Sequence, residues 1–161
     1  MIFFSGIGNL GIVWIVLALV LVMRRKNRNY GIILLLALLI TAILGEGILK
    51  NIIKRNRPFI VLNDLKLLIP PPGSYSFPSG HTASSFTAFG VFYFLNLRYK
   101  WLVFFIAFFI AFSRIYLGVH YFTDIIGGII LGMGVAYMVC SYYKKNSDRI
   151  NSNKIIKKLF N

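Results

Sequence analysis

Long apolar runs separated by short polar stretches dominate the chain. A helix needs about 20 mostly apolar residues to cross a hydrocarbon core of roughly 30 Å. Backbone groups in lipid must pair within their own segment, and no run alternates as a membrane β-strand would. We therefore expect an all-α fold, a polytopic transmembrane bundle of about five helices. The five runs are residues 3–23, 30–49, 82–97, 101–118 and 120–143, of which the third and fourth are short.

The stretch between the second and third runs, residues 50–80, is the one sizeable segment outside the apolar runs. Its apolar residues are interleaved with Lys and Arg, which is typical of a short helical segment lying in the headgroup layer. The Pro-Pro-Pro-Gly run at 70–73 ends any helix there. No internal repeat or low-complexity linker is visible, so residues 1–161 are expected to form a single integral membrane domain. Within the last run, Gly128 and Gly132 favour close packing against another helix.

Composition and charge agree with a membrane location, because 58% of the residues are hydrophobic and the formal net charge is +14. The basic residues follow alternate runs instead of lining one groove, so we expect no nucleic-acid partner. Positive charge marks the cytoplasmic side of a membrane protein. That side would carry the basic tail at 144–161, which lies against anionic headgroups or simply fixes the topology. The N-terminus and both histidines would face outward. The cytoplasmic set is twelve of the 18 Lys and Arg residues: Arg24, Arg25, Lys26, Arg28, Arg98, Lys100, Lys144, Lys145, Arg149, Lys154, Lys157 and Lys158.

Lys50 and Arg57 are seven residues apart, so a helix that continues past the second run would carry both on one face. Two aligned cations at a membrane surface form a site for an anion. For either residue alone, the competing interpretation is a flanking charge that reaches the headgroups. That is the role we expect for Lys54 and Arg55. Glu46, one turn before Lys50, is an intramembrane carboxylate that can pair with it as structural support.

The sequence has only two histidines, and each lies in a short polar motif. His81 ends the motif Pro78-Ser79-Gly80-His81, directly before the run at 82–97. Proline and glycine favour a turn, so Ser79 and Gly80 are expected at a helix N-terminus, where free N–H groups and the helix dipole bind anions. His81 would stand at the edge of that site as a proton donor. A capped helix start with an interfacial histidine is the alternative interpretation.

His120 follows Ser113 and Arg114 in the chain and precedes Asp124 by one helical turn. An aspartate in that position can hold one ring nitrogen and leave the other as a nucleophile. Arg114, in an apolar setting, needs an anion, and the chain has only four carboxylates. A phosphoryl group fits this need better. The alternative is a polar cluster that holds helices together.

The three motifs together resemble the signature of the type 2 phosphatidic acid phosphatase superfamily, the lipid phosphate phosphatases. The resemblance extends from about residue 30 to residue 143. Members of that family commonly have six spans, and we expect this chain to lack one at its N-terminal end. The matching positions are Lys50, Arg57, Pro58, Pro78, Ser79, Gly80, His81, Ser113, Arg114, His120 and Asp124.

The resemblance implies a metal-independent phosphatase that forms a covalent phosphohistidine. In that scheme His120 attacks phosphorus, Asp124 orients it, and His81 protonates the leaving oxygen and later activates water. We expect no cofactor, and the scarcity of carboxylates independently disfavours a two-metal site. The residues implied to hold the phosphate oxygens are Lys50, Arg57, Ser79, Gly80 and Arg114.

An outward-facing site in a chain without a soluble domain favours a substrate anchored in the lipid bilayer. Undecaprenyl diphosphate, phosphatidylglycerol phosphate and phosphatidic acid all fit, and the motifs do not separate them. A phosphotransferase that uses the same histidines and a noncatalytic protein that binds anionic lipid are the alternatives. A pore or transporter is disfavoured, because the polar residues lie near one face. The sequence does not choose an oligomeric state.

Overall fold

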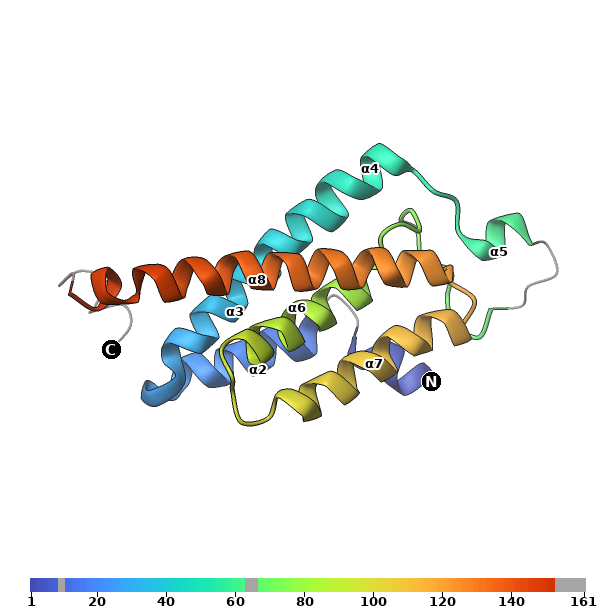
Figure 1. Cartoon of the computed structure of the whole chain (residues 1–161). Coiled ribbons are helices and arrows are strands. Elements are labelled where there is room, and N and C mark those ends of the chain that lie inside the picture. Colours follow the sequence, from blue (N-terminus) through green and yellow to red (C-terminus); the bar gives the residue numbers. More distant parts are fainter. Residues whose placement is uncertain (9–10, 63–66, 153–161) are drawn as a thin grey trace.

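The computed structural model describes residues 1–8, 11–62 and 67–152, with side chains up to residue 146 apart from Ile7. Its elements are helices joined by loops (Figure 1). In chain order they are α1 (Ile2–Ile7), α2 (Ile12–Met23), the 3₁₀ turn η2 (Arg25–Asn27), α3 (Arg28–Ala42), the π-helical segment η3 (Ile43–Leu49), α4 (Lys50–Ile53), α5 (Pro58–Val61), α6 (Gly80–Phe94), α7 (Lys100–Tyr116) and α8 (Phe122–Ser152).

Helix α6 is packed against α3, α7 and α8, and it forms the core of the bundle (Figure 1). Most of its residues are buried, and many of them are Ala, Ser, Thr or Gly, which let neighbouring helices approach closely. Two buried polar contacts join it to other helices. Trp14 Nε1 donates to Ser85 Oγ at 2.9 Å, and the hydroxyls of Thr41 and Thr87 lie 2.7 Å apart. These contacts tie α2 and α3 to α6 in an apolar setting.

Gly128 and Gly132 let α8 approach α6, as their spacing predicts. A Cβ on Gly128 would lie 2.9 Å from the carbonyl oxygen of Ser79, and a Cβ on Gly132 would lie 2.8 Å from the backbone nitrogen of Thr87. Both distances are too short for any side chain larger than hydrogen. The contact also aligns the first turns of the two helices, so that the Ser79 N–H donates to the Asp124 carbonyl at 3.1 Å. The two histidine motifs are therefore brought together by glycine packing.

Two helical stretches of the described residues, Arg25–Val61 and Phe122–Asn146, are long and apolar enough to cross a membrane, and α2 is a shorter apolar helix. The run at 3–23, expected as one span, is instead divided between α1 and α2. Gly11 has a φ of 67°, a left-handed conformation that glycine adopts at little steric cost and that here directly precedes α2. The prediction of one continuous first helix is therefore corrected.

The basic residues expected on the cytoplasmic side gather toward one end of the bundle. The α2–α3 turn with Arg24 and Arg25, the α6–α7 turn with Arg98 and the far end of α8 lie toward one end (Figure 1). The loops around α4 and α5 and the α7–α8 connection lie toward the other end (Figure 1). Residues 153–161 of the expected basic tail lie outside the described residues, and so does Lys66.

Candidate functional site

A cavity of about 800 Å³ opens where the N-terminal end of α6, the last turn of α7 and the loops around α4 meet. Its walls combine apolar side chains from α1, α2 and α3 with a group of charged and polar ones. Ser79 and Asp124 do not line it, and both lie fully buried behind it. Of the residues expected to form a site, those that line the cavity are Lys50, Arg57, Gly80, His81, Arg114 and His120.

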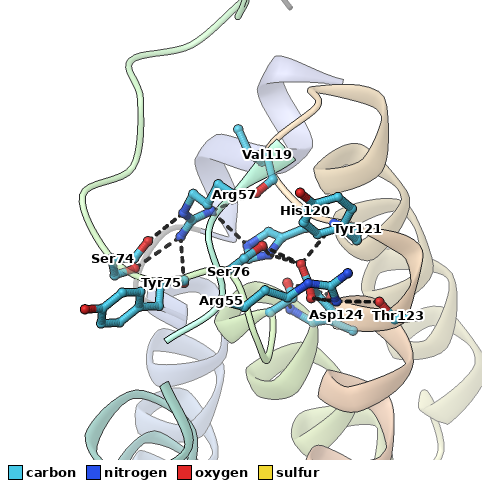
Figure 2. A network of polar contacts seen from close by, with 12 residues as sticks. Arg55, Arg57, Ser74, Tyr75, Ser76, Val119, His120, Tyr121, Thr123 and Asp124 are labelled. Carbon is cyan, nitrogen blue, oxygen red and sulfur yellow. Dashed lines mark hydrogen bonds and ion pairs between the residues drawn. The ribbon is translucent and has the colours of Figure 1, made fainter. Parts of the chain in front are cut away.

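His120 lies in the short connection between α7 and α8. Gly118, with a φ of 67°, turns the chain after α7, and His120 precedes the first residue of α8 by two positions. Its Nδ1 lies 3.3 Å from Asp124 Oδ2, and its Nε2 lies 3.2 Å from Nη1 of Arg57 (Figure 2). A guanidinium can only donate, so Nε2 must accept, which assigns the ring hydrogen to Nδ1. The nitrogen with the lone pair is therefore the one toward Arg57 and the cavity.

Burial lowers the pKa of His120 to about 4. The nearby cations of Arg57 and Arg114 act in the same direction, whereas the hydrogen bond to Asp124 raises this pKa. The imidazole of His120 is consequently neutral at pH 7, and a neutral imidazole keeps a lone pair for attack on an electrophile.

Asp124 is fully buried in the first turn of α8 and is held by several donors (Figure 2). Its Oδ2 accepts from Ser76 Oγ at 2.5 Å and from the Tyr121 N–H at 2.9 Å. Its Oδ1 accepts from Nη1 of Arg55 at 2.8 Å. Ser76 is a contact that the sequence analysis did not select. Its position two residues before Pro78, next to the PSGH motif, could have identified it from the sequence.

Arg57 reaches the cavity by a different route from the one expected. The helix that carries Lys50 ends at Ile53, and Lys54 is left-handed with a φ of 48°. Arg57 follows in an extended conformation as the N-cap of α5, because a residue before proline disfavours the helical region. The prediction of one helix through Lys50 and Arg57 is therefore wrong, although both side chains line the same cavity.

The guanidinium of Arg57 is bound on several sides. Nε donates to the Ser74 carbonyl at 2.6 Å, Nη2 donates to the Tyr75 carbonyl at 3.3 Å, and Nη1 donates to the Val119 carbonyl at 2.9 Å. These bonds fix the plane of the forked guanidinium group beside His120 (Figure 2). Only a guanidinium, with five donors in fixed directions, satisfies all these acceptors.

Lys50 is buried and bound to Glu46 and to the loop before α6. Its Nζ lies 2.9 Å from Glu46 Oε1 and donates to Ser74 Oγ at 3.0 Å. The expected pairing of Glu46 with Lys50 is confirmed. Glu46 belongs to the π-helical segment η3, and a Cβ added to Gly80 would collide with its carboxylate. A larger residue at position 80 would therefore displace the Glu46 side chain from its place beside Lys50.

Ser79 is the N-cap of α6, as predicted, and its hydroxyl accepts from the Thr82 N–H. His81 and Arg114 stand beyond it, and each has a buried nitrogen without a partner among the described residues: Nε2 of His81 and Nε of Arg114. Nη1 of Arg114 donates to the hydroxyl of Ser5. Ser5 comes from α1, and the sequence analysis did not select it because nothing distinguishes a serine within an apolar run.

Arg55 does not have the role that the sequence analysis assigned to it. We expected a flanking charge in the headgroups, but Arg55 forms an ion pair with Asp124. On a continued helix, Arg55 would point well away from the face of Lys50 and Arg57, whereas the end of the helix at Ile53 changes that direction. Lys54 is exposed, as expected.

The site thus gathers three buried cations, Lys50, Arg57 and Arg114, the N-terminus of α6 and two histidines around one cavity. Among the residues that the structure describes, no group of three His, Cys, Asp or Glu side chains is placed to hold a metal ion. These features define a class of helical proteins with a cavity lined by cations at one end of an apolar bundle.

The chain belongs to the PAP2 superfamily, whose family model matches residues 30–148. It is 33% identical over 139 residues to an undecaprenyl-diphosphatase of Sulfolobus acidocaldarius; the matched part covers 86% of this chain and 66% of that relative, just under two thirds. This family and the two apolar helices identify a membrane protein.

Two solved structures have the same fold. The crystal structure of Aquifex aeolicus LpxE is 34% identical, with a TM-score of 0.73, and the match covers 88% of this chain and 85% of that one. The crystal structure of a transmembrane PAP2 type phosphatidylglycerolphosphate phosphatase from Bacillus subtilis is 31% identical, with a TM-score of 0.68, over 88% of this chain and 75% of that one. The all-α membrane fold expected from the sequence is confirmed at this level, and the number of spans is not.

Proposed function

We propose that the protein is a lipid phosphate phosphatase that hydrolyses a membrane-anchored phosphate or diphosphate through a phosphohistidine on His120. The observation that carries the proposal is the pair of buried, unpartnered nitrogens, His81 Nε2 and Arg114 Nε, in the cavity that His120 also lines. Nε of Arg114 is a buried donor without an acceptor, which is costly, and Nε2 of His81 becomes a second donor when its ring is protonated. A phosphoryl group in the cavity supplies acceptors for both and charge for the three cations.

In the proposed reaction, Nε2 of His120 attacks phosphorus and the bond from phosphorus to the leaving oxygen breaks. Burial lowers the pKa of His81 to about 3, whereas the negative charge of a bound phosphate raises it, so that His81 reacts as an imidazolium and gives its proton to that oxygen. Water then attacks the phosphohistidine with His81 as base, and inorganic phosphate leaves. Asp124 holds the Nδ1 hydrogen throughout and stabilises the ring while Nε2 carries the phosphoryl group. Charge that develops on the phosphoryl oxygens is stabilised by residues that line the cavity, Lys50, Arg57, Arg114 and the Gly80 backbone. Ser79, which was expected to join them, supports the site as the N-cap of α6.

The apolar part of the cavity supports a lipid-anchored substrate. Ile15, Leu35, Leu38 and Leu39 line it, while Lys50 lies at the polar end. Lys50 is eleven positions after Leu39, which is roughly 16 Å at the rise of an α-helix. A lipid chain among the leucines would thus bring its phosphate to the cations. Undecaprenyl diphosphate, phosphatidylglycerol phosphate and phosphatidic acid are the candidate substrates, and the first two agree with the names of the relatives.

We further propose about five spans in a single domain over residues 1–161, an extracytoplasmic site and a cytoplasmic basic tail. The basic turns at one end of the bundle support this orientation. The test replaces Cys140, the single cysteine, with Ala and introduces Asn56→Cys at the site end or Arg98→Cys at the other. A membrane-impermeant maleimide applied to intact cells is expected to label position 56 alone. Labelling of position 98 instead would show that the topology is the reverse of the proposed one.

The activity is tested with purified protein, the three candidate lipids and excess EDTA, by measuring released phosphate. We expect release from at least one lipid, no loss of rate with EDTA, and no release by the His120→Ala variant. Phosphate transfer to an added alcohol or lipid without free phosphate would indicate a phosphotransferase. If the lipids bind but no phosphate is released from any of them, with or without added Mg²⁺, the protein is noncatalytic and the proposal is contradicted.

A further inference from the structure

Arg55 lies outside the cavity and contacts Asp124 on the side away from His120 (Figure 2). Its Nη1 donates to Asp124 Oδ1 at 2.8 Å and to Thr123 Oγ1 at 2.6 Å. The centre of its guanidinium lies 4.0 Å from the middle of the Tyr121 ring. The side chain is 35% exposed, whereas the Asp124 side chain is fully buried. Arg55 thus reaches a buried carboxylate from the protein surface.

The two oxygens of Asp124 have different partners. Oδ2 accepts from Ser76 and from the Tyr121 N–H and faces Nδ1 of His120. Oδ1 is held by Arg55. A carboxylate bound at one oxygen can turn about its Cβ–Cγ bond, but one bound at both oxygens is fixed in plane. The contact with Arg55 therefore sets the direction in which Oδ2 faces the imidazole.

The backbone of Arg55 supports the same group of residues. Its carbonyl accepts the Ser76 N–H at 2.8 Å, and Ser76 in turn donates its hydroxyl to Asp124. One residue therefore holds the carboxylate directly through its side chain and indirectly through Ser76. A buried carboxylate that loses its cation is an uncompensated charge in an apolar setting, so the pair is sensitive to removal of either partner.

We infer that Arg55 is a positioning residue of the reaction, forming with Asp124 and His120 a chain of three: guanidinium, carboxylate and imidazole. The inference rests on the proposed function, because it assigns Arg55 to the nucleophile of that reaction. Arg55 touches neither the substrate nor the phosphoryl group. It acts on the rate of attack by keeping Asp124 aimed at Nδ1 of His120.

The first test compares two charge-removing variants of adjacent residues, Arg55→Gln and Lys54→Gln, both followed by thermal unfolding to confirm a folded protein. We expect Arg55→Gln to lower kcat at least about 10-fold with KM within about twofold, in the range found when outer partners of metal-binding histidines are removed. Lys54→Gln, an equal charge change on an exposed neighbour, is expected to leave both constants unchanged. A raised KM with unchanged kcat for Arg55→Gln would instead place Arg55 in substrate binding and overturn the inference.

The second test is a double-mutant cycle with Asp124→Asn, in which the charge that Arg55 compensates is absent. In that background, Arg55→Gln is expected to lower kcat no further. An equal loss in both backgrounds means that Arg55 acts independently of Asp124, and this result also overturns the inference. If Arg55→Gln does not yield folded protein, Arg55→Lys is used in both backgrounds. Its expected effect is a threefold to tenfold loss of kcat, which Asp124→Asn abolishes.

A wild-type protein that releases no phosphate from any lipid refutes the proposed function, whereas an active enzyme with unchanged kcat in the Arg55 variants refutes only this inference.

Discussion

Nη1 of Arg57 lies 3.2 Å from Nε2 of His120, so the nitrogen proposed to attack phosphorus is held by a cationic donor. The same guanidinium is fixed by the carbonyl groups of Ser74, Tyr75 and Val119. A phosphoryl group that enters the cavity offers Nη1 a charged oxygen in place of Nε2. Such an exchange frees the lone pair when the substrate is in position, without moving the rest of the fork.

Arg57 is therefore expected to be intolerant of replacement by lysine. Arg57→Lys keeps the charge but supplies a single ammonium, which cannot satisfy four acceptors in different directions. We expect kcat/KM to fall about 100-fold, or about 2.7 kcal/mol of transition-state stabilisation. Arg98→Lys, the same change at the opposite end of the bundle, serves as the control and should leave kcat/KM unchanged. A loss of less than about threefold in Arg57→Lys would show that the fork geometry is not needed.

The state of His120 can be measured directly, because the chain has only two histidines. In His81→Gln protein labelled with ¹⁵N-histidine, all imidazole signals belong to His120. We expect the neutral form with its hydrogen on Nδ1 at pH 6 and a titration midpoint near 4, since the pKa of His120 is lowered to about 4, mainly by burial.

The direction in which pH changes the stability of the protein follows from the lowered pKa of His120. Unfolded protein binds a proton at His120 near pH 6.5, and the folded protein binds it near 4. The contribution of His120 to stability is therefore full above about pH 6.5 and is lost as the pH falls toward 4. A midpoint near 6.5 in the NMR titration, or a hydrogen on Nε2, would contradict the geometry of the site.

The close contact between α6 and α8 predicts a difference between two neighbouring glycines. A Cβ on Gly132 would collide with the backbone of Ala83 and Thr87, whereas a Cβ on Gly134 would meet nothing within 4 Å. Gly132→Ala is expected to lower the unfolding free energy by about 1–3 kcal/mol through overpacking. Gly134→Ala should be neutral or slightly stabilising, because alanine is the better helix former. Thermal unfolding in one detergent compares them, and equal effects would mean that the helices do not pack through Gly132.

The sequence could predict those parts of the site that depend on local chemistry. Ser79 at the start of α6, Asp124 one turn after His120 and the Glu46–Lys50 pair all follow from spacing along one helix or turn. Arg55 was assigned wrongly because its direction depends on where α4 ends, and Lys54 in the left-handed region is not a feature that the apolar pattern encodes.

Contacts between distant segments also escaped prediction. Ser5 meets Arg114 because the run at 3–23 breaks near Gly11 and lets α1 pack against α7. Ser76 meets Asp124 through the loop before α6. Neither residue stands out within its own segment, so only the three-dimensional arrangement identifies them.

The central claim is that His120 carries the phosphoryl group. It is tested most directly by mixing the purified protein with ³²P-labelled lipid phosphate, quenching in alkaline detergent within the first turnover and mapping the label by mass spectrometry. We predict phosphate on His120, none in His120→Ala, and slower loss of the label once it has formed in His81→Gln, in which the water that clears the intermediate lacks its base. Label on any other residue, or a labelled intermediate that persists in His120→Ala, would contradict the account.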